Sequence, residues 1–391
     1  MDSKISIRSL PFQVSALDWD CHDAVTRYLT HSIHRYSGKF IPQVARQMIE
    51  LLSAPREIIL DPFCGSGTTL LEAALYQRRS IGIDLNPVAT MISKVKCTPL
   101  SETLLSRELA NVQTLLSTIG GASRNGQLSL RFHTDRKWNS DPRLGDSWYL
   151  KWFQRPVLEQ LVAIYQTISS IGNVHVRNLT SVAFSNILRK SSNASSAYPN
   201  VMFDRSITSR PLPLKPFLLE LHKTCAMVTE LHRTVSGRTW YAPQVILADS
   251  RAIPLPDKSV DAIITHPPYI GSIPYAEYQQ LSLHWFGHES KALDTILIGG
   301  RRQAKDVLSR YRLGMRETLL EIRRVLKPGR MIGFLIGDPL VHGRRVSLFR
   351  LISKCASECE LHLIAAHRRR GINHRANKMS RERVVFFQRP D

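Results

Sequence analysis

The sequence of 391 residues lacks the features of several protein classes. No apolar run reaches the ~18–20 residues that a membrane span requires, and the first residues, MDSKISIRSL, contain no apolar core of the signal-peptide kind. The six cysteines include no C-x-x-C pair. This spacing favours neither a disulfide framework nor a zinc site, so we expect no metal, no membrane partner and a reducing cytoplasm as the location.

Acidic residues are scarce relative to basic ones. The chain has 32 Asp and Glu against 53 Lys and Arg, which gives a net charge of +21, and 43% of its residues are hydrophobic. A chain this apolar folds rather than forming a disordered tail. A positive excess on a folded protein indicates a polyanionic partner, most simply nucleic acid, although a generally basic surface has the same composition. Residues 301–391 carry much of the excess, with 22 Lys and Arg against 8 Asp and Glu.

Short apolar segments alternate with helical patterns at both ends of the chain, and a mostly helical stretch separates the two ends. We expect strands at 57–60, 80–85, 244–248, 261–265, 330–337, 361–367 and 383–388. We expect helices at 41–52, 68–77, 155–171, 212–235 and 317–326. This alternation is typical of an α/β fold with a mainly parallel sheet covered on both faces. Residues 1–100 and 241–391 would form that domain, and residues 101–240 a mostly helical insertion.

The segment EIILDPFCGSGTTLLEAA (57–74) carries the clearest chemical signal. An apolar strand ends at Asp61, Gly65 and Gly67 follow, and a helix begins near Thr68. Glycines in such a turn let the backbone approach a ligand, and the helix N-terminus offers free N–H groups. A tight strand-to-helix turn without a ligand needs glycines too. The lysine of a phosphate-binding P-loop is missing, which argues against a site for nucleotide phosphates.

The second expected strand ends in IGIDLNP and places Asp84 23 residues after Asp61. An acidic residue about 20 residues beyond a glycine loop can accept hydrogen bonds from ribose hydroxyls. Alternatively, an Asp at the end of a strand caps the next turn. Together, the loop and Asp84 predict a ligand that contains a nucleoside.

DPFCGSGTT followed by IGIDLNP resembles the first two motifs of the amino-methyltransferases of DNA, which use S-adenosylmethionine (SAM). This resemblance implies a class I SAM-dependent methyltransferase fold, that is, a doubly wound and mainly parallel seven-stranded sheet, with SAM as the methyl donor. HRYSGKFIPQVARQMI (34–49) resembles the family segment that completes the methionine pocket, and QVILAD (244–249) resembles its third motif. The cofactor contacts implied are Lys39, Phe40, Asp61, Phe63, Gly65, Gly67, Thr68, Asp84 and Asp249. Without the family, Lys39 is a solvated charge and Phe40 a core residue.

The expected strand at 261–265 runs into HPPYIGSIPYAEY. Two prolines stop strand pairing and stiffen a loop at the carboxyl edge of the sheet, where ligands bind in doubly wound folds. Prolines also form simple turns. In the company of the glycine loop, His266-Pro267-Pro268-Tyr269 resembles the catalytic [DNS]-P-P-[YFW] motif of the same family.

The resemblance implies that the target base flips out of double-stranded DNA and stacks on Tyr269. Its exocyclic amino group donates hydrogen bonds to the Pro267 carbonyl and to the side chain at position 266. His266 departs from the family pattern. Neutral imidazole accepts such a bond and protonated imidazole does not, so we expect activity to fall around pH 6. The sequence THPPY (265–269) is nearest the T-S-P-P-Y form, which favours cytosine N4. Adenine N6, RNA methylation and a catalytically silent nucleic-acid-binding protein are the alternatives.

The run HRRRGINHRANKMSRER (367–383) has seven Lys and Arg against one Glu, and it lies between the last two expected strands. A basic loop near the active edge can neutralise DNA phosphates. The candidates for DNA contacts are Arg368, Arg369, Arg370, Arg375 and Lys378, with Arg189, Lys190 and Asn193 in the insertion as further ones. The resemblance to the restriction-modification type implies that the insertion contains the target-recognition region and that a cognate restriction endonuclease is a partner.

Overall fold

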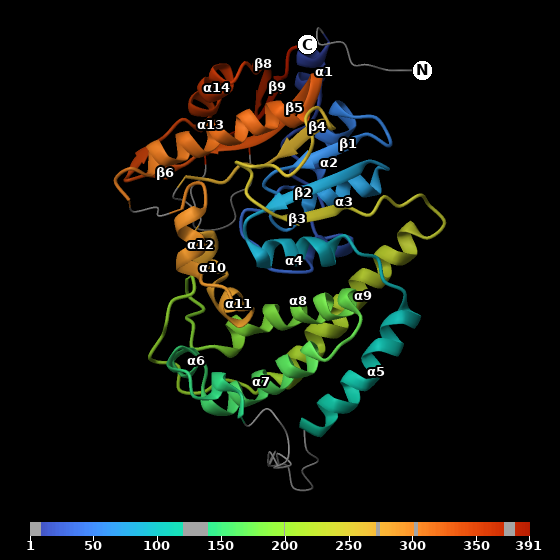
Figure 1. Ribbon diagram of the computed structural model, residues 1–391, viewed down its shortest axis with the longest axis vertical. Helices are drawn as coiled ribbons and strands as arrows, with labels where there is room; N and C mark the ends of the chain where they lie inside the picture. The colour runs from blue at the N-terminus through green and yellow to red at the C-terminus, as the bar shows by residue number, and fades with distance from the viewer. Residues whose placement is uncertain (1–8, 120–139, 199, 271–273, 301–303, 371–379) are drawn as a thin grey trace.

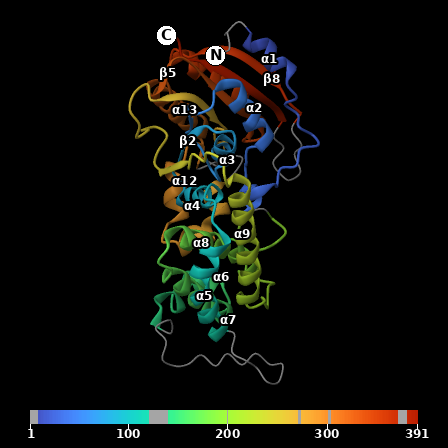
Figure 2. The same ribbon diagram turned by 90° about the vertical axis from the view of Figure 1, so that its right-hand side faces the viewer.

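The computed structural model describes residues 9–119, 140–198, 200–270, 274–300, 304–370 and 380–391. The molecule is elongated, with a sheet and its covering helices at one end and a group of helices at the other (Figures 1 and 2). In the described part of the chain, no helix combines the length and the apolar character that crossing a membrane requires.

A seven-stranded sheet forms the centre of the first part, in the order β3-β2-β1-β4-β5-β9-β8. Its strands are β1 (Ile58–Asp61), β2 (Arg79–Asp84), β3 (Gln244–Leu247), β4 (Val260–Thr265), β5 (Leu326–Asp338), β8 (His362–Arg368) and β9 (Ser380–Gln388). All pairs from β3 to β5 are parallel, and β9 is antiparallel to both of its neighbours. This is the class I methyltransferase fold, so the predicted fold class is confirmed. A small hairpin, β6 (Leu340–Val341) and β7 (Arg344–Arg345), follows β5.

Helices cover both faces of the sheet. They are α1 (Leu10–Ala16), α2 (Pro42–Leu52), α3 (Thr68–Leu75), α4 (Pro87–Lys96), α13 (Val307–Val325) and α14 (Leu348–Glu358). Alternate strand residues point to opposite faces. Ile59 therefore packs with the buried residues of α1 and α2, whereas Leu60 packs with those of α13 and α14. Apolar side chains on both faces explain why the strands read as continuous hydrophobic runs.

A block of helices separates α4 from β3 along the chain. It comprises α5 (Glu102–Ile119), the 3₁₀ helix η3 (Pro142–Leu144), α6 (Ser147–Trp152), α7 (Arg155–Ser169), α8 (Val174–Ser191) and α9 (Leu214–Val235). Three short helices lie later in the chain, α10 (Tyr275–Tyr278), α11 (Gln280–Trp285) and α12 (Ser290–Ile296). Trp285 of α11 is fully buried and contacts the rings of Phe153 and Phe184. The chain just beyond the Pro-Pro-Tyr loop therefore packs on the helical block, which the division of the sequence at residue 241 does not anticipate.

Each expected strand is present within a few residues of its predicted bounds. The helix expected at 317–326 is the last part of α13, which begins ten residues earlier, at Val307. The other described helices were not predicted individually. They are the 3₁₀ helices η1 (Leu29–Ser32) and η3 and the helices α1, α4, α5, α6, α8, α10, α11, α12 and α14.

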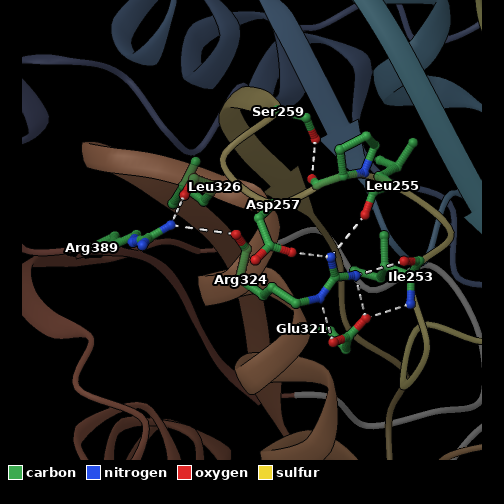
Figure 3. Close-up of polar contacts among 9 residues, drawn as sticks. Ile253, Leu255, Asp257, Ser259, Glu321, Arg324, Leu326 and Arg389 are labelled. Carbon is green, nitrogen blue, oxygen red and sulfur yellow. Dashed lines mark hydrogen bonds and ion pairs between the residues drawn. The ribbon is translucent and has the colours of Figure 1, made fainter.

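The loop between β3 and β4 is fixed by one arginine of α13 (Figure 3). The Arg324 guanidinium donates to the carbonyls of Ile253 and Leu255, at 2.7 and 2.8 Å, and to the carboxylate of Asp257 at 2.7 Å. Glu321, one turn earlier in α13, accepts from both Arg324 and the backbone N–H of Ile253. This network holds the segment that leads into β4.

Gly82 in β2 leaves no room for a methyl group beneath α3. A Cβ at this position would lie 2.5 Å from Leu70 Cδ1 and 2.9 Å from Cys64 Cβ. We expect Gly82→Ala to lower the free energy of unfolding by about 1–3 kcal/mol through overpacking, measured by urea denaturation. The control is Gly172→Ala, because a Cβ there meets no atom within 4 Å, and its effect should stay within about 0.5 kcal/mol. Equal stability of the two variants would contradict the close packing of α3 on β2.

Candidate active site

The carboxyl ends of three neighbouring strands meet at one edge of the sheet. Strand β1 pairs in parallel with both β2 and β4, so the loops that follow these strands emerge together. Residues of all three loops line one pocket. The lining includes Phe63, Gly65, Asp84, His266 and Pro268. The structure thus brings together the glycine loop, Asp84 and the Pro-Pro-Tyr loop, which the sequence analysis singled out separately.

The glycine loop adopts a conformation that favours glycine. Gly65 has φ +49° and Gly67 has φ +78°, both in the left-handed region. A Cβ at Gly65 would lie 3.2 Å from the ring of Tyr36, and one at Gly67 would lie 2.9 Å from Ser93 Oγ. Ser93 Oγ donates to the Gly65 carbonyl at 2.7 Å. The turn is therefore tight on one side and presents its backbone to the pocket on the other.

Asp84 joins the end of β2 to the glycine loop. Its Oδ2 accepts from the backbone N–H of Gly65 at 2.9 Å, and its Oδ1 accepts from that of Asn86 at 2.8 Å. Burial raises the pKa of Asp84 to about 6. Above that pH the group is a carboxylate, and each oxygen keeps a lone pair for another donor. Asp84 can therefore accept hydrogen bonds from a ligand in the pocket.

Asp61 does not line the pocket among the residues that the structure describes. Its buried Oδ1 accepts from the Phe63 backbone N–H at 3.1 Å and from the Thr265 hydroxyl. Burial raises the pKa of Asp61 to about 6. The residue ties the end of β1 to the end of β4. The structure thus gives it a role in positioning the two loops instead of the predicted cofactor contact.

Lys39, Phe40 and Thr68 line a second cavity that adjoins the first, with Tyr36 lining both. Phe40 is buried, and its ring centroid lies 5.7 Å from that of His266. These three predicted cofactor contacts lie beside the pocket that holds Asp84. Phe40 also contacts the Pro-Pro-Tyr loop through the ring of His266.

His266 and Tyr269 contact each other within the Pro-Pro-Tyr loop. The Tyr269 hydroxyl is hydrogen-bonded to His266 Nε2, and the two rings meet edge to face at 4.8 Å. Tyr269 is only 4% exposed. Burial, together with the charge of Arg369, lowers the pKa of His266 to about 4, against a hydrogen bond to the Gly38 backbone that raises it. An imidazole with this pKa is still neutral at pH 6, so the structure does not support a loss of activity at that pH through His266.

Asp249 is held by its neighbour Arg251. The Arg251 guanidinium contacts both oxygens of the Asp249 carboxylate, the shortest distance being 2.5 Å. In the described part of the chain the pocket wall is formed by the adjacent Ala248 and Ser250 and not by Asp249. The predicted bond from Asp249 to the adenine of the cofactor has no support in this arrangement, since Arg251 takes up the carboxylate.

The described arginines at the end of β8 and directly after it differ in exposure. Arg369 is only 5% exposed, and its guanidinium pairs with Glu382 at 2.8 Å and donates to the carbonyl of Trp19. The prediction that Arg369 contacts DNA is wrong, because its donors are used inside the protein. Arg368 and Arg370 are exposed, and Arg375 and Lys378 lie outside the described residues.

Several pocket residues were missed by the sequence analysis. Tyr36 lies within the HRYSGKF segment but was not singled out. Tyr275 also lines the pocket and lies within HPPYIGSIPYAEY, but it was not singled out. Leu297 and Ile298 line the pocket as well, and they belong to a stretch that carries no sequence motif. Among the described residues, no group of three or more His, Cys, Asp and Glu side chains is placed to hold a metal ion.

Comparison with known proteins identifies relatives of this site. Residues 19–94, which include the glycine loop and Asp84, match the protein family described as DNA methylase. The chain is 26% identical over 296 residues to the type II methyltransferase M.MvaI of Kocuria varians. This match covers 71% of this chain and 63% of that protein. It is 42% identical over 86 residues to the type II methyltransferase M.MjaII of Methanocaldococcus jannaschii, and this match covers 20% of this chain and 16% of that protein.

A third relative from Methanocaldococcus jannaschii is named a tRNA (guanine(10)-N2)-dimethyltransferase. It is 40% identical over 52 residues, 13% of this chain and 15% of that protein. The match spans less than two thirds of the length of each of these three relatives.

The protonation of His266 can be measured directly. We expect its imidazole to stay neutral until the pH falls to about 4, because burial disfavours the charged form. Two-dimensional NMR of the histidine-labelled protein follows the titration, and the spectrum of His266→Gln assigns the signal. A midpoint at or above pH 6 would contradict the buried arrangement of the loop.

Proposed function

We propose that this chain, a member of the DNA amino-methyltransferase family, transfers a methyl group from SAM to an exocyclic amino group of double-stranded DNA in the cytoplasm. The observation that carries the proposal is the single pocket lined by the glycine loop, by Asp84 and by the Pro-Pro-Tyr loop. The match of residues 19–94 and the similarity to M.MvaI support it.

The pocket suits the nucleoside part of SAM. Leu85, Ala248, Leu297 and Ile298 provide apolar walls, and Asp84 provides a carboxylate. Apolar walls with a few polar groups are usual for small-molecule sites, and a carboxylate at the end of the second strand is placed to accept from ribose hydroxyls. SAM, when bound, supplies an electrophilic methyl group at this edge of the sheet.

The Pro-Pro-Tyr loop positions the base. The flipped base stacks on the ring of Tyr269, and its amino group donates to the Pro267 carbonyl and to the acceptor nitrogen of His266. These bonds make the lone pair of the amino nitrogen more available for attack, so orientation and electrostatics lower the barrier without a covalent enzyme intermediate. The Tyr269 hydroxyl occupies His266 Nε2 in the structure, so it moves aside when the base enters.

The target base is cytosine N4 in this proposal, because THPPY is nearest the T-S-P-P-Y form. Residues 101–240 contain the target-recognition region, and the partner is a cognate restriction endonuclease. Adenine N6 is the second candidate.

Product analysis tests the proposal. The protein is incubated with isotope-labelled SAM and plasmid DNA, and the DNA is digested to nucleosides for mass spectrometry. We expect labelled N4-methylcytosine. Labelled N6-methyladenine would replace the assignment of the base, and label found only in an RNA sample run in parallel would overturn the DNA substrate. SAM binding without transfer to either polymer would show a silent protein.

The same assay, applied to two matched variants of Tyr269, tests whether the base stacks on its ring. Tyr269→Ala should lower kcat by roughly 10- to 100-fold, since stacking of a base on an aromatic ring contributes about 1–3 kcal/mol. Tyr269→Phe keeps the ring and should keep the activity. Equal activity of the two variants would exclude stacking on Tyr269.

The carboxylate of Asp84 makes cofactor affinity depend on pH. With a pKa of about 6, the group is ionised above pH 7 and becomes protonated as the pH falls through 6, so SAM should bind more weakly below pH 6. Asp84→Asn should weaken SAM binding by roughly 10- to 100-fold, because hydrogen bonds to a charged group contribute about 1.5–3 kcal/mol, and should remove this pH dependence.

Isothermal titration calorimetry across pH 5–8 measures both effects. Asp61→Asn is the control, because Asp61 has a similarly raised pKa but is not one of the residues that line the pocket. If the pH dependence disappears in Asp61→Asn and persists in Asp84→Asn, Asp84 does not contact the ribose.

A further inference from the structure

A second cavity, of about 710 Å³, adjoins the pocket that holds Asp84. Tyr36 lines both spaces. The walls of the second cavity come from residues 26–42, from the end of α8 and from the first half of α9. The 3₁₀ helix η1 within the first of these segments packs against α9. The cavity therefore lies where the sheet part of the molecule meets the helical block, and its size is usual for a ligand site.

Positive side chains dominate the outer part of this cavity. Four exposed residues, here called the rim cations, are Arg27, Arg35, Lys190 and Lys223. The carboxylate found in the described lining is that of Glu220, which lies 3.6 Å from Lys223. In the part of the chain that the structure describes, no ion pair joins the other three rim cations to a carboxylate.

The floor of the cavity is positive as well. The ammonium group of Lys39 donates to the backbone carbonyls of His31 and His34, at 3.1 and 2.5 Å. Burial, together with the charges of Arg27 and Lys223, lowers the pKa of Lys39 to about 8. The three cations line the same cavity although they come from different elements. Their repulsion opposes folding, and an anion in the cavity would relieve it.

We propose that the rim cations bind consecutive backbone phosphates of the DNA strand that carries the target base, so that this strand follows the cavity toward Tyr36 and the catalytic pocket. The inference rests on the proposed function. A SAM carboxylate would need a single cation, and Lys39 at the floor would be that cation. Four further cations spread over three elements match the repeated charge of a phosphodiester backbone. Such contacts fix the register of the strand without reading its sequence.

The test compares two triple variants of the full chain with the same change of charge. The rim variant carries Arg27→Gln, Arg35→Gln and Lys223→Gln. The control variant carries Arg316→Gln, Arg350→Gln and Lys354→Gln, three exposed residues of α13 and α14, on the sheet end of the molecule away from the helical block (Figure 1).

DNA affinity is measured by fluorescence anisotropy with a duplex of about 25 base pairs over a salt titration, and SAM affinity by calorimetry. The slope of log K against log salt is negative, and each lost phosphate contact reduces its magnitude by about 0.9. For the rim variant, which lacks three contacts, we expect the magnitude of this slope to fall by about 3. Its DNA affinity near 0.1 M salt should fall at least roughly tenfold, and its SAM affinity should be retained. The control variant should lose less than about threefold in affinity and keep its slope.

The other outcomes overturn the inference in distinguishable ways. Equal losses in the two variants would show attraction by general surface charge, and no loss in the rim variant would exclude phosphate contacts there. Loss of SAM affinity with unchanged DNA affinity would assign the cavity to the cofactor. If the wild-type chain binds SAM but no DNA, the proposed function fails together with the inference, and binding of a parallel RNA duplex would then identify the other polymer.

Discussion

The hydrogen bond from the Gly65 backbone N–H to the half-buried Asp84 carboxylate is the contact on which the site depends. It joins the loop after β1 to the end of β2, and Asp61 makes the corresponding link from β1 to β4 through the Thr265 hydroxyl. Parallel pairing brings the three strand ends to one edge, but it does not fix the loops. The carboxylates of the buried Asp61 and the half-buried Asp84 do so, because each accepts from donors of the loops that would otherwise lack partners.

The Pro-Pro-Tyr loop is held from two sides. At its start, β4 belongs to the sheet, and the Arg324 network fixes the segment that leads into this strand. At its end, α11 inserts Trp285 into the core of the helical block. The loop therefore bridges the two parts of the molecule, and a movement of the helical block against the sheet would act directly on His266 and Tyr269. The helical block and the carboxyl edge of the sheet are connected through this loop.

The sequence predicts most of the sheet because each strand is a local apolar run whose burial does not depend on distant detail. It also predicts the glycine loop and Asp84, whose spacing carries the signal. It does not predict the neutral state of His266, since the low pKa arises from burial beside Phe40 and from the charge of Arg369, both distant in the chain. The pairing of Asp249 with Arg251 is different. The two residues are two positions apart, so this pair was within reach of sequence reasoning.

Net charge predicts the class of partner but not the place of contact. In the densest basic run, 367–383, Arg369 is paired with Glu382 inside the protein. The cations around the cavity beside the pocket come instead from segments that contain no basic run. Electrostatic attraction in physiological salt decays over about 8 Å. A distant cation therefore raises the rate of encounter with a polyanion, and only cations next to the pocket can fix the register of a strand against Tyr269. The arrangement of charge around the site is therefore more informative about a polyanionic partner than the total charge.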